Sequence, residues 1–238
     1  MSKTVLSKRL QTIADMVTPG NSICDIGCDH AHIPIYLVEN GKVPKAIVMD
    51  INTGPLERAR VHIAAKGLLD VIDIRQSDGF KALKKGEVDT IIMSGMGGRL
   101  IEAILTAAHS KTADIKEFIL GPQSEIPALR RYLRKSGYHT ENEDLILEDE
   151  KFYPIIKVKQ GKAKPNEPSA TLIFDCYGKI PLKERNPVLL MYLKREYHAT
   201  LGIINNINSS SYLSKQSEIK LNELKRKADE LQDLINMW

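Results

Sequence analysis

The chain has few cysteines, few aromatic residues and no long apolar run. Its 238 residues include three cysteines, an odd number without paired spacing, which argues against a secreted protein stabilised by disulfides. No apolar stretch approaches the roughly 18 residues that a membrane-spanning helix needs, and no apolar run typical of a signal peptide follows the N-terminus. We therefore expect a cytoplasmic protein that does not associate with membranes.

The chain also lacks a strong excess of one charge. It has 34 Lys and Arg against 30 Asp and Glu, for a net charge of +4. Such a mildly basic balance permits an anionic partner such as a nucleic acid without requiring one. Hydrophobic residues make up 42%, so a chain of this length buries a substantial core without disulfides or metal.

Short apolar runs alternate with helix-length segments over the first part of the chain. The expected strands are 22–26, 46–50, 71–75, 88–93 and 117–120. The expected helices are an opening helix with Leu6, Leu10, Ile13 and Val17 on one face, then 31–40, 55–66, 98–109 and 124–136, with Ser124 as the last N-cap. This alternation predicts an α/β fold with a mostly parallel sheet, and the apolar stretches 144–147 and 152–158 predict a terminal antiparallel hairpin.

The last part of the chain has a different pattern. Residues 160–169 hold two prolines and one glycine, which makes them the best candidate boundary between domains 1–162 and 163–238. Beyond this boundary, apolar residues recur three or four positions apart in two long segments on either side of a polar stretch, 205–211. This pattern predicts two helices that form an antiparallel coiled-coil hairpin.

The first expected strand ends in an acidic loop with one glycine, Asp25-Ile26-Gly27-Cys28-Asp29-His30. In open α/β sheets, ligands bind outside the carboxyl ends of the strands. The pyrophosphate of a dinucleotide needs several glycines at a helix N-terminus, whereas the cationic S-adenosylmethionine favours acidic side chains. The loop therefore argues against NAD or FAD and for S-adenosylmethionine, although Asp25 by itself also fits a helix cap or a turn.

Two further strands end in aspartates. Asp50 lies one β-α-β step after Gly27 and can accept hydrogen bonds from both ribose hydroxyls. Asp78 follows the third strand and can accept from the adenine amine, although Asp78-Gly79 also fits an ordinary turn. Three acidic strand ends in this order indicate a methyltransferase site. The fourth strand ends in a glycine-rich loop, 94–99, where a flat base can approach the backbone.

The segments DIGCDHAHIP, MDINTGPLERA, QSDGF, SGMGG and GPQSEIPALRRYL together resemble the bacterial tRNA (adenine-22-N1)-methyltransferases, the TrmK family. The resemblance covers nearly the whole chain. It implies a class I Rossmann-like methyltransferase fold with a seven-stranded sheet, S-adenosylmethionine as the methyl donor, and N1 of an adenine in the D-arm region of tRNA as the acceptor. It also implies a C-terminal coiled-coil domain that helps to hold tRNA.

Carried onto this chain, the resemblance predicts a cofactor site built from all of these segments. The methionine end would lie against Asp25, Gly27, Asp29 and His30, the ribose against Asp50, Ile51 and Asn52, and the adenine against Asp78 and Gly79. Met93, Ser94 and Gly95 would lie beneath the sulfonium. Arg9 would reach the carboxylate, or else be a solvated arginine of the helix surface.

The predicted reaction leaves two roles open for Asp29. It either stabilises the charge that develops on the methylated adenine or binds only the ammonium group of the cofactor. Ser94 and Gly95 would orient the target base, which must first be flipped out of the folded RNA. Tyr153 either stacks on the flipped base or is an aromatic residue of the core. The expected RNA-contacting residues are Met96, Gly97, Arg99, Arg130, Arg131 and Arg134, with a solvated helix face as the alternative for the arginines after residue 129.

The sequence does not indicate a metal site or a dimer. Cys24, Cys28, His30 and His32 match no standard zinc spacing, and the strand pattern points Cys24 away from Asp25. A monomer is expected, because an intrachain hairpin accounts for the apolar stripes of the last two helices. Two other functions stay open: a methyltransferase for a different substrate, and a non-catalytic or regulatory RNA-binding protein that keeps the fold.

Overall fold

The structure, a computed structural model, describes residues 3–108, 111–161, 172–209 and 214–238. The chain divides into two compact units, Met1–Ile180 and Pro181–Trp238. The predicted linker, 160–169, lies mostly outside the described residues. The first unit continues beyond it, so the second unit begins later than the boundary expected after residue 162.

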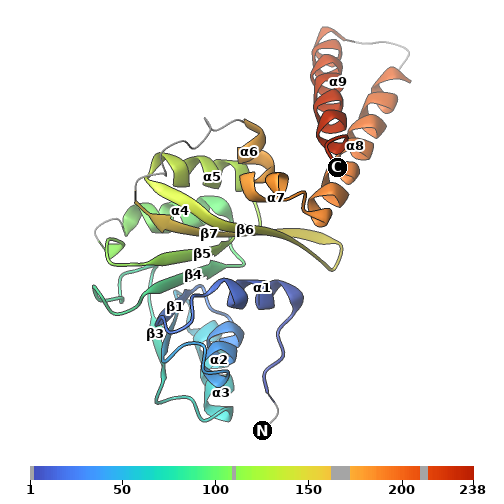
Figure 1. Ribbon diagram of the computed structural model, residues 1–238. Helices are drawn as coiled ribbons and strands as arrows, with labels where there is room; N and C mark the ends of the chain where they lie inside the picture. The colour runs from blue at the N-terminus through green and yellow to red at the C-terminus, as the bar shows by residue number, and fades with distance from the viewer. Residues whose placement is uncertain (1–2, 109–110, 162–171, 210–213) are drawn as a thin grey trace. The chain divides into compact units, whose positions relative to one another are not determined.

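The first unit is built around a seven-stranded sheet with the order β3-β2-β1-β4-β5-β7-β6 (Figure 1). Its strands are β1 (Ile23–Ile26), β2 (Ala46–Asp50), β3 (Ile72–Gln76), β4 (Thr90–Ser94), β5 (Glu117–Gly121), β6 (Tyr138–Glu148) and β7 (Lys151–Gln160). The first five are parallel, and β7 is antiparallel to both β5 and β6. The predicted parallel sheet with a terminal antiparallel hairpin is confirmed.

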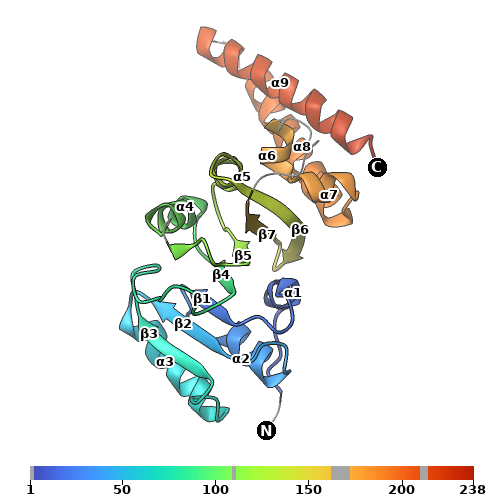
Figure 2. The same cartoon turned by 60° about the vertical axis from the view of Figure 1, so that its left-hand side comes forward.

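Helices cover both faces of this sheet (Figures 1 and 2). One face packs against α1 (Lys8–Met16), α2 (His32–Glu39) and α3 (Thr53–Ala65), and the other packs against α4 (Gly98–Ala107) and α5 (Ile126–Lys135). Side chains alternate along each strand, so Ile23 belongs to the first apolar layer and its neighbour Cys24 to the second. Cys24 thus faces away from Asp25, as the strand pattern predicted.

Two local predictions differ from the structure. Strand β6 begins at Tyr138, well before the apolar stretch that predicted it, because its first half carries polar side chains that the apolar pattern does not show. Helix α5 has Glu125 as its N-cap, with a left-handed backbone at φ 53°, and no side chain caps it. Ser124 is therefore not the cap; its carbonyl oxygen accepts a hydrogen bond from the Gly98 amide at 3.0 Å.

Two short helices that the sequence pattern did not predict, α6 (Leu172–Tyr177) and α7 (Lys179–Lys183), come next. The second unit contains α8 (Pro187–Asn208) and α9 (Lys215–Ile235), which lie side by side and antiparallel (Figure 1). Their seam includes Leu201, Ile204 and Leu224. This confirms the predicted helical hairpin. None of the described helices has the length and apolar character needed to span a membrane.

Candidate functional site

The carboxyl ends of the parallel strands meet at one edge of the sheet. Ile26 at the end of β1 is level with Met49 of β2 and Met93 of β4, and Asp50 is level with Gln76 at the end of β3. The loops that follow these strands carry most of the residues expected to bind a cofactor. The fold thus brings together, at one edge, segments that are far apart in the sequence.

The carboxyl group of Asp25 is buried at this edge, with 6% of the residue exposed. Burial raises its pKa to about 7, while a hydrogen bond with Cys28 opposes the rise and the charge of Asp50 adds to it. A carboxyl group in this state ionises readily when a cation comes close. The environment therefore suits a positively charged ligand.

Gly27 follows in a conformation that other residues rarely adopt, with φ at +80°. A Cβ atom at this position would lie 2.5 Å from Cε of Met96, so a larger residue would require the flexible Met96 side chain to move; the left-handed backbone is what favours glycine. The Gly27 amide donates to the carbonyl oxygen of Met49 at 2.8 Å, which holds the turn against β2.

Asp29 lies at the surface in the loop after β1 and contacts helix α3. Its Oδ1 accepts hydrogen bonds from the Arg58 guanidinium, with Nε at 2.9 Å, and its Oδ2 lies 3.1 Å from Nε2 of His30. The hydrogen bonds from Arg58 lower the pKa of Asp29, so the group is ionised at neutral pH. Arg58 was not identified from the sequence, although it lies in one of the segments that carry the family resemblance.

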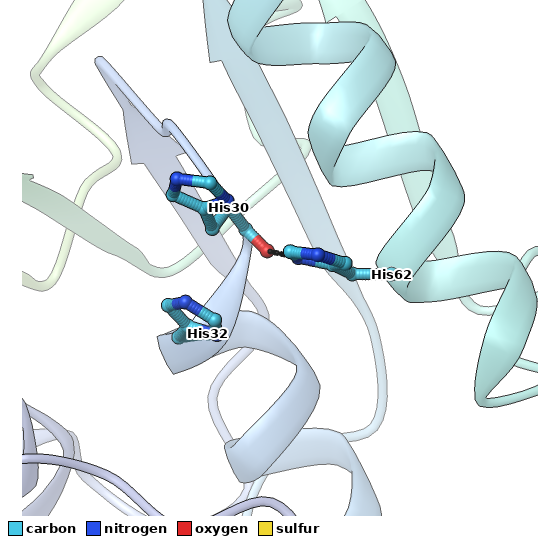
Figure 3. A group of neighbouring side chains, drawn as sticks. All are labelled: His30, His32 and His62. Carbon is cyan, nitrogen blue, oxygen red and sulfur yellow. Dashed lines mark hydrogen bonds between the residues drawn. The ribbon is translucent and has the colours of Figure 1, made fainter.

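Three histidines surround the end of this loop (Figure 3). His30 follows Asp29, His32 begins α2 and His62 lies on α3, and their ring centres are 5.3 to 5.6 Å apart. His62 was not among the predicted site residues, because nothing in the local sequence relates it to the other two. Burial, together with the two neighbouring imidazoles, lowers the pKa of His32.

The loops after β2 and β3 adjoin. The Asn52 amide donates to Oδ1 of Asp50 at 2.8 Å, and the Gln76 side chain donates to the carbonyl oxygen of Ile51 at 2.9 Å. The Ile51 side chain is 57% exposed, an apolar surface beside a carboxylate. In the next loop, Asp78 pairs with Lys81 at 2.6 Å. A pocket of about 260 Å³ is lined by residues 78–81 and by apolar side chains of α4.

The glycine-rich loop after β4 is joined by backbone hydrogen bonds to the loop after β5. The Gly95 amide donates to the Gly121 carbonyl oxygen at 3.1 Å, and the Gln123 amide donates to that of Met96 at 3.0 Å. The side-chain amide of Gln123 lies 4.0 Å from where a Cβ of Gly95 would be. Gln123 was not among the predicted site residues, although it follows β5, which is parallel to β4 and ends at the same edge.

Arg9 and Tyr153, predicted separately, lie in contact. The Arg9 guanidinium lies over the Tyr153 ring, 4.9 Å from its centre, and Arg9 Nε is 3.8 Å from Glu148. Nε is buried and has no hydrogen-bond partner among the described residues. A buried donor of a cationic group without a hydrogen bond suits an anionic ligand atom, such as the carboxylate that the sequence assigned to Arg9.

The arginines expected to contact RNA fall into two groups. Arg130 has a side chain only 11% exposed; it pairs with Glu143 at 2.7 Å and donates to the carbonyl oxygens of Asp175 and Cys176. It therefore has a structural role, joining α5 to β6 and α6. The side chains with substantial exposure are Arg99 (63%), Arg131 (45%) and Arg134 (44%), although Arg99 pairs with Glu102 and the other two with Asp175.

The chain is similar to known proteins over nearly its whole length. Residues 6–156 match the methyltransferase domain family. The tRNA (adenine(22)-N(1))-methyltransferase of Bacillus subtilis (strain 168) is 34% identical over 237 residues, which is 99% of each chain. The crystal structure of the B. subtilis m1A22 tRNA methyltransferase TrmK superposes with a TM-score of 0.84 over 98% of this chain and 100% of that one, at 34% identity.

A second solved structure shows a related protein with a ligand. M. capricolum TrmK in complex with S-adenosyl-homocysteine, the product of the natural cofactor, superposes with a TM-score of 0.79 at 28% identity. The match covers 97% of this chain and 98% of that one.

Proposed function

The chain belongs to the family of bacterial tRNA (adenine-22-N1)-methyltransferases, and we propose that it transfers a methyl group from S-adenosylmethionine to N1 of adenine 22 in the D-arm region of tRNA. The observation that carries this proposal is 34% identity over 99% of both chains, which leaves no domain of the relative unmatched. The acidic residues at the ends of the parallel strands, which lie at one edge of the sheet, support the same proposal from the structure. We also propose that the enzyme acts in the cytoplasm as a monomer.

The residues at the strand ends fit this cofactor. S-adenosylmethionine supplies an electrophilic methyl group on a sulfonium. Asp25, Gly27, Asp29 and His30 would hold its methionine end, Asp50, Ile51 and Asn52 its ribose, and Asp78 and Gly79 its adenine. Met93, Ser94 and Gly95 would lie beneath the sulfonium, and Arg9 would bind the carboxylate. The buried Arg9 Nε, which has no hydrogen-bond partner among the described residues, and the buried carboxyl group of Asp25 both support this arrangement.

The protein's main contribution to the reaction is positioning. N1 of adenine carries an in-plane lone pair and needs little activation, so holding it in line with the methyl group supplies most of the acceleration. Ser94 and Gly95 would orient the base, and the amide of Gln123 beside Gly95 adds a further hydrogen-bonding group there. Asp29 is already bound by Arg58 and His30, which reduces its attraction for either cation, so both roles stay open: binding of the cofactor ammonium and stabilisation of the methylated base.

The proposed RNA surface continues from this loop onto α4 and α5. Met96 and Gly97 would contact the target base, and the exposed Arg99, Arg131 and Arg134 would contact phosphates. Arg130 is left out because its guanidinium is nearly buried in a structural ion pair. Tyr153 stays a proposed stacking partner of the flipped base, because it contacts Arg9, which we place at the cofactor. The helical hairpin of the second unit would help to hold the tRNA.

The test is a methylation assay on an unmodified tRNA transcript with adenine at position 22 and on a matched transcript with guanine there. We expect 1-methyladenosine, mapped by mass spectrometry of nuclease fragments, in the first transcript only. Calorimetry with S-adenosylmethionine runs in parallel. Cofactor binding without methylation of either transcript would indicate a different substrate. RNA binding without cofactor binding would indicate a non-catalytic protein.

A further inference from the structure

Three histidines beside the candidate cofactor site are close enough to one another to be candidate ligands of a metal ion (Figure 3). His30 comes from the loop after β1, His32 from the start of α2 and His62 from α3. One nitrogen from each side chain lies within 4.8 Å of the corresponding nitrogens of the other two. Among the described residues, this group has the ligand types and the proximity that a metal ion needs.

The ring positions agree with a single central ion. Zinc–nitrogen bonds of about 2.0–2.1 Å place each imidazole centre roughly 3.2 Å from the metal, so three such rings have centres about 5.2–5.6 Å apart at tetrahedral or trigonal angles. The observed separations are 5.3, 5.3 and 5.6 Å. The ring planes lie 15–22° from parallel, and zinc-bound nitrogens lie roughly 3.3–3.6 Å apart, so the side chains would rotate to bring their nitrogens closer when an ion binds.

The hydrogen bonds of two of the rings leave one nitrogen of each ring available to an ion. His62 Nδ1 lies 3.1 Å from the carbonyl oxygen of His30, so a proton on Nδ1 is donated there and Nε2 keeps its lone pair. His30 Nε2 lies 3.1 Å from Asp29, so a proton on Nε2 is donated to the carboxylate and Nδ1 keeps its lone pair. Metal-binding histidines have this pattern, in which the second nitrogen donates to a carbonyl or a carboxylate.

The second ring nitrogen of His30 is in an unfavourable environment. Nδ1 is buried and has no hydrogen-bond partner within the described part of the chain. A buried nitrogen without a partner is unfavourable unless a ligand or an ion completes its bonding. His32, the third ring, is exposed and lies across from it, so an ion can enter from solvent.

We propose that His30, His32 and His62 bind one divalent transition-metal ion, with zinc as the first candidate because it accepts three imidazoles and leaves a fourth position for water. The ion would join the loop that carries Asp29 and His30 to helix α3. The sequence alone predicted no metal, because Cys24, Cys28, His30 and His32 have no zinc spacing and His62 lies far along the chain. His30 is also a proposed contact of the cofactor, so the metal site is tested by metal binding and not by methyl transfer.

The test measures metal binding rather than activity. Untagged full-length protein, stripped with a chelator and dialysed, is titrated with zinc chloride against a competing chromophoric chelator. We expect one ion per chain with a dissociation constant on the order of 1 µM or tighter. Cobalt(II) in place of zinc should give the visible absorption of a four-coordinate site, and zinc should raise the Tm.

Three variants locate the site. His62→Ala and His32→Asn should each weaken zinc binding at least tenfold, while His198→Ala, which removes an exposed histidine of α8, should leave it unchanged. Circular dichroism checks that each variant is folded. The two site variants are independent, so if one of them fails to fold, the other still tests the site. Absence of stoichiometric binding in the wild type, or equal affinity in all three variants, overturns the proposal.

Discussion

At the scale of single residues, the carboxyl group of Asp25 is the most informative feature of the site. It is nearly inaccessible, has Asp50 nearby, and its pKa is raised to about 7, chiefly by burial. Such a group is half protonated at neutral pH when no cation is close. A cationic cofactor favours the ionised form, so cofactor binding must release a proton in this pH range.

Cofactor affinity should therefore depend on pH. Because only the ionised Asp25 attracts the cation, the dissociation constant for S-adenosylmethionine should rise as the pH falls through about 7. It should be about tenfold higher at pH 6 than at pH 8, since each pH unit below a pKa reduces the ionised fraction about tenfold. Isothermal titration calorimetry at several pH values measures this. Asp25→Asn should bind more weakly than the wild type at pH 8, approach the wild-type affinity at pH 6 and lose the dependence; a wild-type affinity that is constant from pH 6 to 8 would contradict the assignment.

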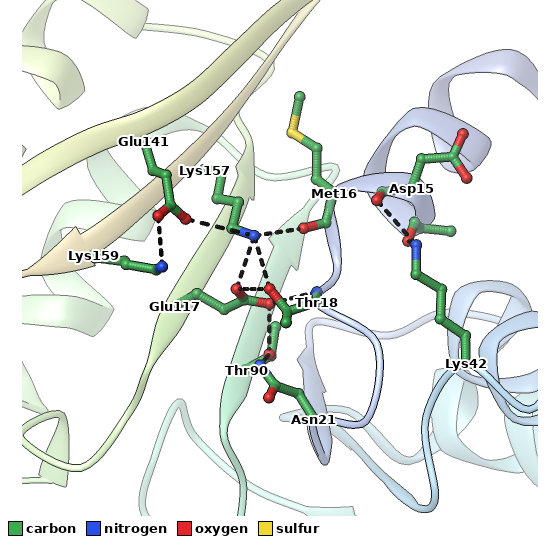
Figure 4. Close-up of polar contacts among 11 residues, drawn as sticks. Asp15, Met16, Thr18, Asn21, Lys42, Thr90, Glu117, Glu141, Lys157 and Lys159 are labelled. Carbon is green, nitrogen blue, oxygen red and sulfur yellow. Dashed lines mark hydrogen bonds and ion pairs between the residues drawn. The ribbon is translucent and has the colours of Figure 1, made fainter.

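At the scale of elements, a buried polar cluster fixes the end of α1 against the sheet (Figure 4). Lys157 of β7 pairs with Glu117 of β5 at 2.8 Å and donates to the carbonyl oxygen of Met16 at 2.9 Å. Glu117 also accepts from Thr18 and from Thr90 of β4. Burial alone would raise the pKa of Glu117, but these hydrogen bonds, with Lys157 first, lower it. The cluster holds the helix that carries Arg9.

Glu117→Gln should lower the free energy of unfolding by about 3 kcal/mol, because it leaves the buried Lys157 with only the more distant and more exposed Glu141, at 3.6 Å, as a counter-charge. Urea unfolding followed by circular dichroism measures the change. The double variant Glu117→Gln/Lys157→Met should recover part of the loss, since the buried charge is gone. Lys85→Gln, which breaks an exposed pair with Asp114 at 3.7 Å, should have almost no effect. Equal losses in the single and double variants would show that the ion pair is not the cause.

At the scale of the whole molecule, the described part of the second unit presents exposed positive charge and none of the predicted site residues. On α9, Lys225 and Arg226 are both exposed, and their neighbour Lys227 pairs with Glu196 of α8 at 3.5 Å. Exposed cations of this kind attract phosphates in a way that depends on salt and not on base identity. The hairpin would therefore contribute to tRNA affinity and not to the chemical step.

The variant Lys225→Gln/Arg226→Gln should raise the KM for tRNA about three- to tenfold near 0.1 M salt. The salt dependence of tRNA affinity should fall by an amount that corresponds to about one to two released counterions. The dissociation constant for S-adenosylmethionine should not change. A matched variant, Lys45→Gln/Lys85→Gln, removes two exposed cations from the first unit, where Lys45 precedes β2 at the opposite edge of the sheet from the candidate site. If both variants leave the KM for tRNA unchanged, the hairpin does not hold tRNA through these charges.

The sequence by itself determined the fold class and the order of the acidic strand ends. Apolar periodicity and the chemistry of the residues at strand ends are local properties, and a parallel sheet places all of those ends at one edge. For this reason Asp25, Asp50 and Asp78 were identified without a structure. The predictions that failed locally, the start of β6 and the cap of α5, depend on neighbours that a short stretch does not contain.

Only the tertiary structure decided which side chains are neighbours across elements. It paired Arg130 with Glu143 and thereby removed it from the expected RNA surface, and it placed Gln123 beside Gly95. It also brought His62 to His30, so that a pair of histidines without metal spacing became a group of three. Residues on different elements come together only through packing of the sheet and helices, and a pattern read along the chain does not contain those contacts.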